Sequence, residues 1–175
     1  SNDGNGVIVL VDSDNCTFSN LTIASNYCSG IDCIDSNPTI QNSLIYNNSN
    51  HGIYSSQFSH PEVEYCNIIA NGGDNFAGLG FLPSHGTVVG INANGDPCDA
   101  YSNIFTDPQL VDHLNDNFNL QPNSPCIDAG DASSSPDPDG SPADIGAFYF
   151  DQIAYAPPEF ELFLSVDDPI SVPAG

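Results

Sequence analysis

The sequence of 175 residues contains no lysine and no arginine, while it carries 23 aspartate and glutamate residues and a formal net charge of −23. Binding to nucleic acid or to an anionic membrane surface depends on basic side chains, so electrostatics excludes both partner classes. The acidic groups also have no Lys or Arg to pair with. Their repulsion must be relieved by cations, salt, spacing or low pH, although salt adaptation or lineage bias would produce the same composition.

Methionine and tryptophan are absent as well. Asp, Asn, Gly and Ser compete for backbone hydrogen bonds and favour turns, and here they separate short clusters of Val, Ile, Phe and Tyr. No window carries a helical hydrophobic stripe of useful length, and no run is long enough to cross a membrane. The composition predicts an all-β protein. Without any methionine, we expect Ser1 not to be the start of the gene product.

An internal repeat is the most informative feature of the chain. The run Thr17–Ile23 returns 22 residues later as Thr39–Ile45, and again as Glu62–Ile69 with an additional residue. A period in the low twenties is typical of a coil of three short strands, and successive coils stack at about 4.8 Å with like residues above like. Three unrelated β-hairpins of similar composition are the alternative.

Stacked coils predict columns of equivalent side chains. Two inward apolar columns are expected, one made of Phe18, Ile40 and Val63 and the other of Ile23, Ile45 and Ile69. Each repeat closes on asparagine, at Asn26, at Asn47 or Asn48, and at Asn71. Stacked asparagine amides can pair up and down the solenoid as a hydrogen-bonded ladder.

This repeat resembles right-handed parallel β-helix proteins of the pectate-lyase-like superfold, over roughly residues 5–105. The stretch that follows, Thr106–Asp112, Asn117–Asp131, Asp137–Gly140 and Ala143–Phe148, resembles the ending of large bacterial surface β-helix proteins. The resemblance implies solenoid coils over residues 1–105, continuing from an upstream part, and a terminal coil and cap over residues 106–150. Residues 151–159 have the composition of a linker. Residues 160–175 resemble the first strand of an immunoglobulin-like β-sandwich.

The chain has six cysteines at irregular spacing and no zinc-type cluster, which favours disulfides in an oxidising, extracellular compartment. These are Cys16, Cys28, Cys33, Cys66, Cys98 and Cys126. Cys98 and Cys126 flank the expected cap and are the best candidates for one bridge. Sequons at Asn15, Asn20 and Asn47 are compatible with glycosylation. We therefore expect an extracellular or cell-surface protein.

Catalysis has little support in the sequence. The lyases that this fold resembles use Lys or Arg as the base and to neutralise the substrate, and neither residue is present. A hydrolase needs only two carboxylates at a suitable separation, but the signatures of the β-helix hydrolases are missing. The four histidines, at positions 51, 60, 85 and 113, lack metal-ligand spacing and are expected to be turn or surface residues. No catalytic residue is assigned.

Calcium is the one cofactor that the sequence suggests. The candidate ligands are Asp131, Asp137, Asp139 and Asp144, which lie close together among Gly and Pro turns. Carboxylate and carbonyl oxygens in such turns are the ligands that calcium prefers. The alternative is a solvated turn in which Asp131 and Asp144 cap backbone N–H groups.

The sequence predicts a non-catalytic structural or adhesive module of a large extracellular surface protein, or a subunit of an extracellular filament. Its partners would be neighbouring domains or copies of the same protein, because open strand edges of a solenoid invite pairing. The alternative is a glycan-binding module or a β-helix glycoside hydrolase that recognises cell-surface glycans. In that case a face made of Tyr27, Tyr46, Tyr54 and Tyr65 is expected to stack on sugar rings.

Overall fold

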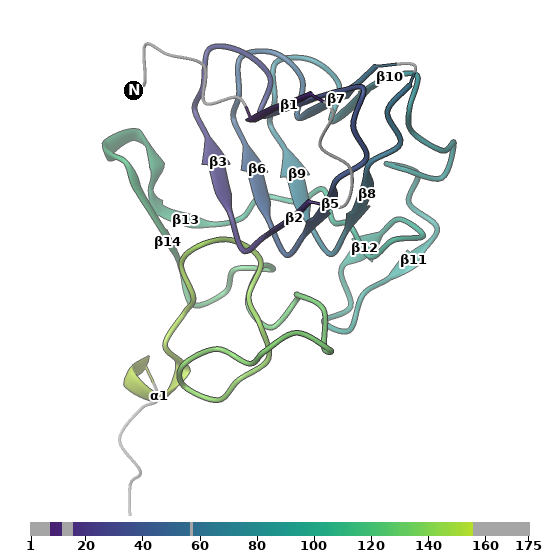
Figure 1. Cartoon of the computed structure of the whole chain (residues 1–175). Coiled ribbons are helices and arrows are strands. Elements are labelled where there is room, and N and C mark those ends of the chain that lie inside the picture. The colour runs from purple at the N-terminus through teal and green to yellow at the C-terminus, as the bar shows by residue number, and fades with distance from the viewer. Residues whose placement is uncertain (1–7, 12–15, 57, 156–175) are drawn as a thin grey trace, which may run out of the picture.

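A computed structural model of the chain describes residues 8–11, 16–56 and 58–155. Three parallel β-sheets form its body, and the chain visits them in turn as it winds around a common interior (Figure 1). The first sheet contains β1 (Ile8–Val11), β4 (Ile31–Ile34), β7 (Ile53–Ser55) and β10 (Phe76–Gly78). The second contains β2 (Thr17–Ser19), β5 (Thr39–Gln41) and β8 (Glu62–Glu64). The third contains β3 (Thr22–Ala24), β6 (Leu44–Tyr46) and β9 (Asn67–Ile69).

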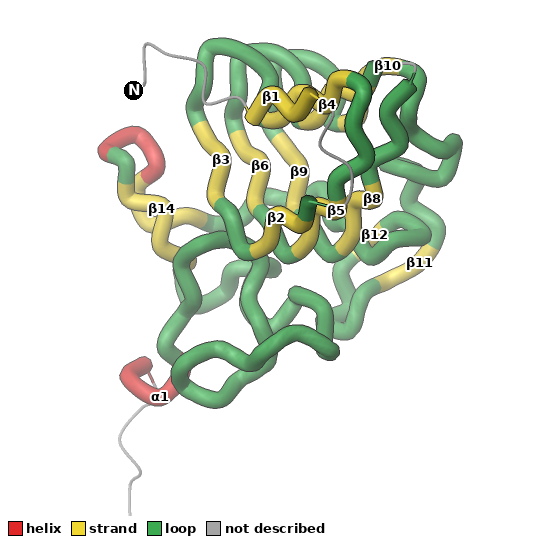
Figure 2. The backbone as a smooth tube through the Cα atoms, in the orientation of Figure 1, coloured by secondary structure: helices red, strands yellow, loops and turns green. Residues whose placement is uncertain are grey.

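Neighbouring strands within each of these sheets come from successive coils and pair in parallel, which confirms the predicted β-helix. In the part of the chain that the structure describes, helix is confined to one short turn at His113–Asn115 and to α1 (Gln152–Tyr155), as the red segments of Figure 2 show. Within the described residues, no helix has the length and apolarity needed to span a membrane.

The register of the sheets tests the predicted columns. Phe18, Ile40 and Val63 stack in the second sheet, as predicted. In the third sheet Ile45 stacks on Ile68, so the prediction of Ile69 was wrong. The third repeat has no internal insertion. The additional residue lies in the loop between β7 and β8, because Ile31 pairs with Ile53 at a spacing of 22 while Thr39 pairs with Glu62 at 23.

The predicted asparagine ladder is confirmed and consists of Asn26, Asn48 and Asn71. The Asn48 side chain accepts from Nδ2 of Asn26 at 2.8 Å and donates to Oδ1 of Asn71 at 3.0 Å. It also donates to the carbonyl of Ile23 at 3.1 Å. Gly52 lies beside the ladder. A larger residue would not fit there, because a Cβ would lie only 3.0 Å from Nδ2 of Asn71 and 2.6 Å from the Ile68 side chain.

One end of the solenoid is closed by residues 76–105, here called the end cap. Its rings cover the last coil of the interior: Phe76 lies 5.0 Å from Phe81 and 6.1 Å from Phe105 between ring centroids. His85 lies edge-on to Phe76 at 5.3 Å and stacks on Tyr101 at 4.2 Å. A core that would otherwise meet water at its last coil is therefore shielded by the chain itself.

The end cap continues the third sheet. Ile104 pairs in parallel with Asn67 of β9 and in antiparallel fashion with Cys98 of β12 (Pro97–Cys98). β12 pairs in turn with β11 (Gly90–Ile91), so the third sheet gains three rows at this end. The second sheet gains none in the described residues and ends at β8.

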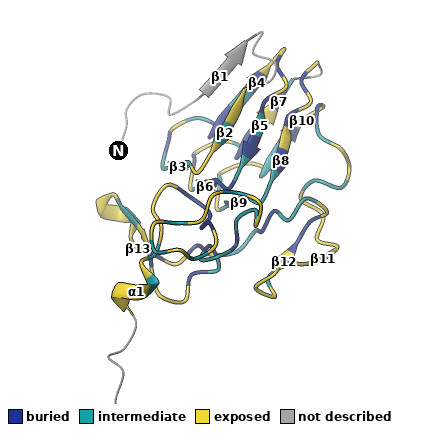
Figure 3. Ribbon diagram, turned by 60° about the horizontal axis from the view of Figure 1, so that its bottom comes forward, coloured by how far each residue is buried: buried dark blue, intermediate teal, exposed yellow. Residues whose placement is uncertain are grey.

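Residues 106–155, here called the C-terminal segment, contain the antiparallel pair β13 (Leu110–Asp112) and β14 (Asn117–Leu120). We expected a terminal coil and cap over residues 106–150. The segment instead runs back along the side of the coils, because it carries its own apolar side chains, which pack around Leu44 of β6. Buried residues, both inside the coils and around Leu44, are coloured dark blue in Figure 3. The expected strand at residues 160–175 lies outside the described residues.

Hydrogen bonds fasten the C-terminal segment to successive coils. The N–H of Asp131 donates to Oδ1 of Asn42 at 2.8 Å in the second coil. The N–H of Ala147 donates to Oγ1 of Thr22 at 3.0 Å in the first coil. The segment therefore crosses the coils from the capped end toward the N-terminal end, and ties them together from outside.

Candidate functional site

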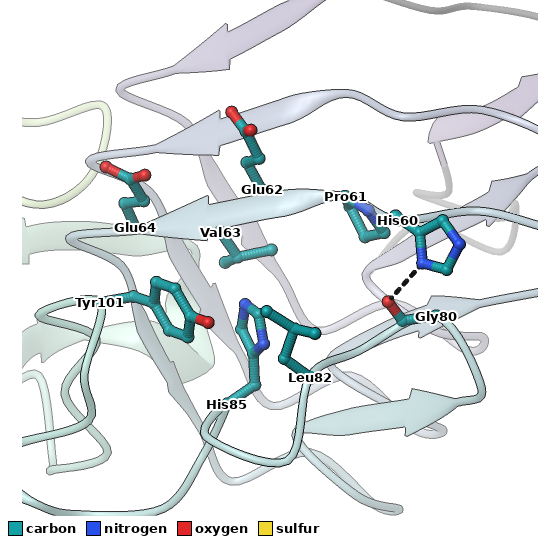
Figure 4. Close-up of a pocket in the computed structure, with 9 residues that line it drawn as sticks. All are labelled: His60, Pro61, Glu62, Val63, Glu64, Gly80, Leu82, His85 and Tyr101. Carbon is teal, nitrogen blue, oxygen red and sulfur yellow. Dashed lines mark hydrogen bonds between the residues drawn. The ribbon is translucent and has the colours of Figure 1, made fainter.

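A cavity of about 320 Å³ lies beside β8, at the edge of the second sheet (Figure 4). It exists because the fourth coil supplies β10 to the first sheet and Ile104 to the third, but no strand to the second within the described residues. Glu62 and Glu64 of β8 form one wall, and His85 and Tyr101 of the end cap form the other. His60 closes the rim, with Nδ1 3.1 Å from the carbonyl oxygen of Gly80.

His85 is the most unusual side chain of this cavity. Both its ring nitrogens are buried and neither has a hydrogen-bond partner in the part of the chain that the structure describes. Burial lowers the pKa of His85, since the surroundings disfavour the charged ring. Its three ring contacts are with the aromatic side chains of Phe76, Phe81 and Tyr101. His85 lies in a turn, as expected, and acts there as a neutral aromatic packing group.

The carboxylates of the cavity do not form a pair suited to glycoside hydrolysis. Glu62 and Glu64 alternate with the inward-facing Val63 on one strand, so their side chains stand side by side on one wall. Hydrolysis requires two carboxyl groups on either side of the bond to be cleaved. Among the described residues, the opposite wall carries His85 and Tyr101 and no acid. The cavity thus has binding groups but no acid–base pair across it.

A shallower cleft of about 250 Å³ lies on the outer side of the first sheet. Asp32 and Tyr54 are adjacent in register there, and Oδ1 of Asp32 is buried without a partner among the described residues. The His51 ring lies near that of Tyr54, with centroids 6.3 Å apart. Nδ1 of His51 accepts the N–H of Asp74 at 3.1 Å, which leaves Nε2 as the protonated nitrogen of the neutral ring.

The tyrosines considered as a sugar-stacking face do not lie together. Tyr54 belongs to the first sheet and Tyr46 to the third, where it contacts the His113 ring edge-on at 5.3 Å. Tyr65 follows β8 at the corner between the second and third sheets, with φ of 50°. Tyr27 follows β3 and is exposed. No continuous ladder of the four rings is formed.

The predicted calcium ligands cap backbone groups in the structure. The carboxylate of Asp144 accepts the N–H groups of Asp128 and Phe150, both at 2.7 Å. Asp137 accepts the N–H of Asp144 at 2.9 Å. Asp139 accepts the N–H of Gln152, also at 2.9 Å. These bonds match the alternative in which the acids stabilise turns.

Asp131 is also engaged, since Oδ2 accepts from Oγ of Ser133 at 2.6 Å and from Nε2 of Gln41 at 2.7 Å. Across the described residues, no group of three or more His, Cys, Asp or Glu side chains is arranged to hold a metal ion. Calcium binding at Asp131, Asp137, Asp139 and Asp144 therefore stays a prediction, without a preformed cluster to support it.

Burial sets the charge state of this acidic region. It raises the pKa of Asp144 to about 6, and the neighbouring charges of Asp137 and Asp128 act in the same direction. The pKa of Asp137 is raised as well, first by burial. In contrast, hydrogen bonds from Ser133 lower the pKa of Asp131. Of the four predicted calcium ligands, Asp144 is thus the one whose ionisation is most costly in the folded state.

The expected disulfides are not present in the structure, where no bond joins any two of the six cysteines. Cys98 and Cys126, the proposed pair, both lie in the apolar cluster around Leu44 and remain unbridged. Sγ of Cys126 accepts from Nδ2 of Asn67 at 3.3 Å, so this sulfur takes part in a core hydrogen bond. Burial raises the pKa of Cys126 to about 11, and that of Cys66 to about 12. Such thiols stay protonated and unreactive.

Two of the three sequons lie on described surface. Asn20 and Asn47 are exposed, both with positive φ, and they directly follow β2 and β6 respectively. Asn15 lies outside the described residues. Glycosylation at Asn20 and Asn47 stays a prediction that their exposure allows.

A family model described as "Right handed beta helix region" matches residues 1–109. The chain belongs to the right-handed β-helix family. No curated protein and no solved structure matches it. The matched residues of this β-helix contain the stacked coils and the end cap, so the family assignment and the observed strand pairing cover the same part of the chain.

The sequence reasoning missed the end cap and the cavity beside it. The signal that marks them is the loss of the repeat spacing after the last asparagine of the ladder, Asn71. Such a loss of period indicates a chain that has stopped coiling and is available to cover its own end.

Proposed function

We propose that this β-helix is a non-catalytic structural or adhesive module of an extracellular protein. The observation that carries the proposal is the aromatic end cap, which closes the coils on the side of β10 with the chain's own side chains. A cap covers the apolar interior at the end of the stack, which repeat proteins need for solubility. The capped coils can then act as a stable structural unit.

The chemistry of the described surface supports this function. The cavity beside β8 lacks carboxylates on opposite walls, and the chain has no Lys or Arg to act as the base of a lyase. The thiols of Cys33 and Cys66 are buried, with their pKa values raised to about 12, which makes them poor nucleophiles. Acid–base or thiol catalysis therefore has no suitable group in these places.

The test is a screen of the whole chain against neutral and acidic polysaccharides, with detection of new reducing ends and of unsaturated products. We expect no turnover above the background of a matched variant with Glu62→Gln and Glu64→Gln. Turnover by the wild-type chain would overturn the proposal. Loss of that turnover in the double variant would locate the activity in the cavity beside β8.

Glycan binding without catalysis is the second candidate, and the cleft at Asp32 and Tyr54 favours it. The Nε2–H of His51 can donate to a sugar hydroxyl, and the ring of Tyr54 can stack on a sugar ring. A glycan array probed with the wild-type chain and with Tyr54→Ala decides this case. Tyr27→Ala, at an exposed tyrosine outside the cleft, is the control.

A further inference from the structure

β11 forms the last row of the third sheet at the capped end. The rows follow in the order β3, β6, β9, Ile104, β12 and β11, and no described strand covers the far side of β11. Figure 1 shows β11 as the outermost strand beside β12. The sheet therefore ends in an open strand edge.

Part of the backbone of this edge is available for pairing, since the N–H of Val89 already donates to the carbonyl of Cys98 at 3.0 Å while Ile91 is open. The N–H of Asn92 donates to the carbonyl of Asp96 at 2.8 Å across the hairpin. In an antiparallel ladder the next residue along the strand faces away from its partner. The N–H and C=O of Ile91 therefore point outward, opposite Pro97, which has no N–H to offer.

The side chains along this edge are apolar and exposed. Val88, Val89 and Ile91 expose 53%, 64% and 71% of their surface. A Cβ added at Gly90 would meet nothing within 4 Å, which shows that this face of the strand is open. Exposed apolar strand edges are rare in soluble proteins unless another strand covers them.

The hairpin is held in place at its tip, so the edge is ordered before any partner arrives. Nδ2 of Asn94 donates to the carbonyl of Ile127 in the C-terminal segment at 2.6 Å. Oδ1 of Asn92 accepts the N–H groups of Asn94 and Asp96, which fixes the turn. A preorganised edge binds a strand with a smaller loss of conformational entropy.

Charge identifies the partner. The chain has no Lys or Arg, so any acidic group at a contact between two copies would be buried without a basic counterpart. Residues 75–95 contain no Asp or Glu, and the edge of β11 lies within them. A basic partner would gain the most favourable electrostatic energy at the acidic surfaces of the chain. It would have no electrostatic reason to bind at this edge.

We propose that the edge of β11 is the docking surface for a second copy of this chain. The two β11 strands pair in antiparallel fashion about a two-fold axis, as an isologous contact requires. Val88, Val89 and Ile91 of one copy then lie against the same residues of its partner, and the third sheets of both copies become one continuous sheet. This contact is independent of the proposed function, because a catalytic or glycan-binding module could form it equally well.

The test is sedimentation equilibrium of the whole chain at low and at high salt. We expect a monomer–dimer equilibrium in which dimerisation strengthens with salt, because salt screens the repulsion between two copies of net charge −23. Val89→Asp and Ile91→Asp should each weaken dimerisation by at least about tenfold, since each places a charge in an apolar contact. Circular dichroism verifies that these exposed positions leave the fold intact.

Leu114→Asp is the matched control, because it adds the same charge at a leucine that is 83% exposed outside the hairpin. It should dimerise as the wild type does. Hydrogen exchange of the wild-type chain gives a second readout, with amides 88–92 expected to exchange more slowly as protein concentration rises. The proposal is overturned if the chain stays monomeric at all concentrations and salt levels, or if Ile91→Asp dimerises as tightly as the wild type.

Discussion

Nδ2 of Asn26 donates a 2.8 Å hydrogen bond to Oδ1 of Asn48, a residue 22 positions away in the next coil. The same oxygen also accepts the backbone N–H of Asn26 at 3.2 Å. Asn48 is almost fully buried, with 1% of its surface exposed. One amide therefore satisfies polar groups of both neighbouring coils.

Replacing Asn48 by alanine should destabilise the protein strongly. The substitution removes the partner of the Asn26 amide and of the Ile23 carbonyl, and both groups remain in the interior. Because a buried polar group without a partner costs about 1–3 kcal/mol, we expect a loss of about 3 kcal/mol in the free energy of unfolding. Urea denaturation monitored by circular dichroism measures the effect.

Asn50→Ala is the control for this prediction. Asn50 is exposed, and its side chain makes one long bond of 3.5 Å to Oγ of Ser29. Its replacement should change the free energy of unfolding by less than about 0.5 kcal/mol. Equal losses in the two variants would show that the ladder contributes no special stability.

The ladder also shows how much the sequence can predict. The repeat of 22 residues was sufficient to predict three-strand coils, the column of Phe18, Ile40 and Val63, and an asparagine ladder, because stacking places equivalent residues together. It could not choose between Ile68 and Ile69, since both are apolar and only the register decides which faces inward. Strand pairing is a contact between distant residues, which local pattern does not specify.

The functional features were harder to predict for a related reason. The cavity beside β8 is made of a strand and a loop that only the end cap brings together, and the cap does not follow the repeat. Closely spaced Asp residues indicated calcium ligands, but composition cannot tell whether a carboxylate faces a cation or a backbone N–H. At Asp144 the N–H groups of Asp128 and Phe150 occupy both oxygens.

Stability should fall as pH rises through the titration of Asp144. Burial raises the pKa of Asp144 to about 6 in the folded state, above the value of about 3.9 typical of an unfolded chain. The folded state therefore binds this proton more tightly. The resulting stabilisation is fully present below about pH 4 and is lost as pH rises to about 6, and it amounts to roughly 3 kcal/mol.

Asp144→Asn isolates this contribution, since it removes the titrating group. Urea denaturation of both proteins across this pH range should give a smaller fall in stability with pH for the variant. The comparison is needed because burial also lowers the pKa of His85, which acts in the opposite direction. Asp35→Asn removes one exposed charge and should leave the slope unchanged. A variant at Asp144 with the wild-type slope would contradict the prediction.

Chelation separates a calcium site from general screening of the acidic surface. Because the carboxylates of Asp139 and Asp144 already accept backbone N–H groups, we expect EDTA at low salt to leave the melting temperature unchanged. Sodium chloride should raise it, since salt screens the repulsion of a chain at −23. A fall in melting temperature on chelation, restored by calcium and not by magnesium, would instead support the calcium site predicted from the sequence.

Replacing His85 by phenylalanine should leave stability unchanged or increase it. Neither ring nitrogen of His85 has a partner in the described residues, and the ring stacks on Tyr101 at a centroid distance of 4.2 Å. Phenylalanine keeps the aromatic contacts and removes two buried polar atoms, each of which costs free energy when unpaired. Thermal and urea denaturation of His85→Phe measure the difference.

His85→Ala provides the contrast, because it removes the ring from the contacts with Phe76, Phe81 and Tyr101. Lost packing at this position should cost about 2–3 kcal/mol. If the phenylalanine variant is as unstable as the alanine variant, then the imidazole nitrogens contribute to the fold or hold a bound group, and His85 is more than an aromatic residue of the end cap. If stability decreases in the order His85→Phe, wild type, His85→Ala, the ring closes the solenoid by packing alone.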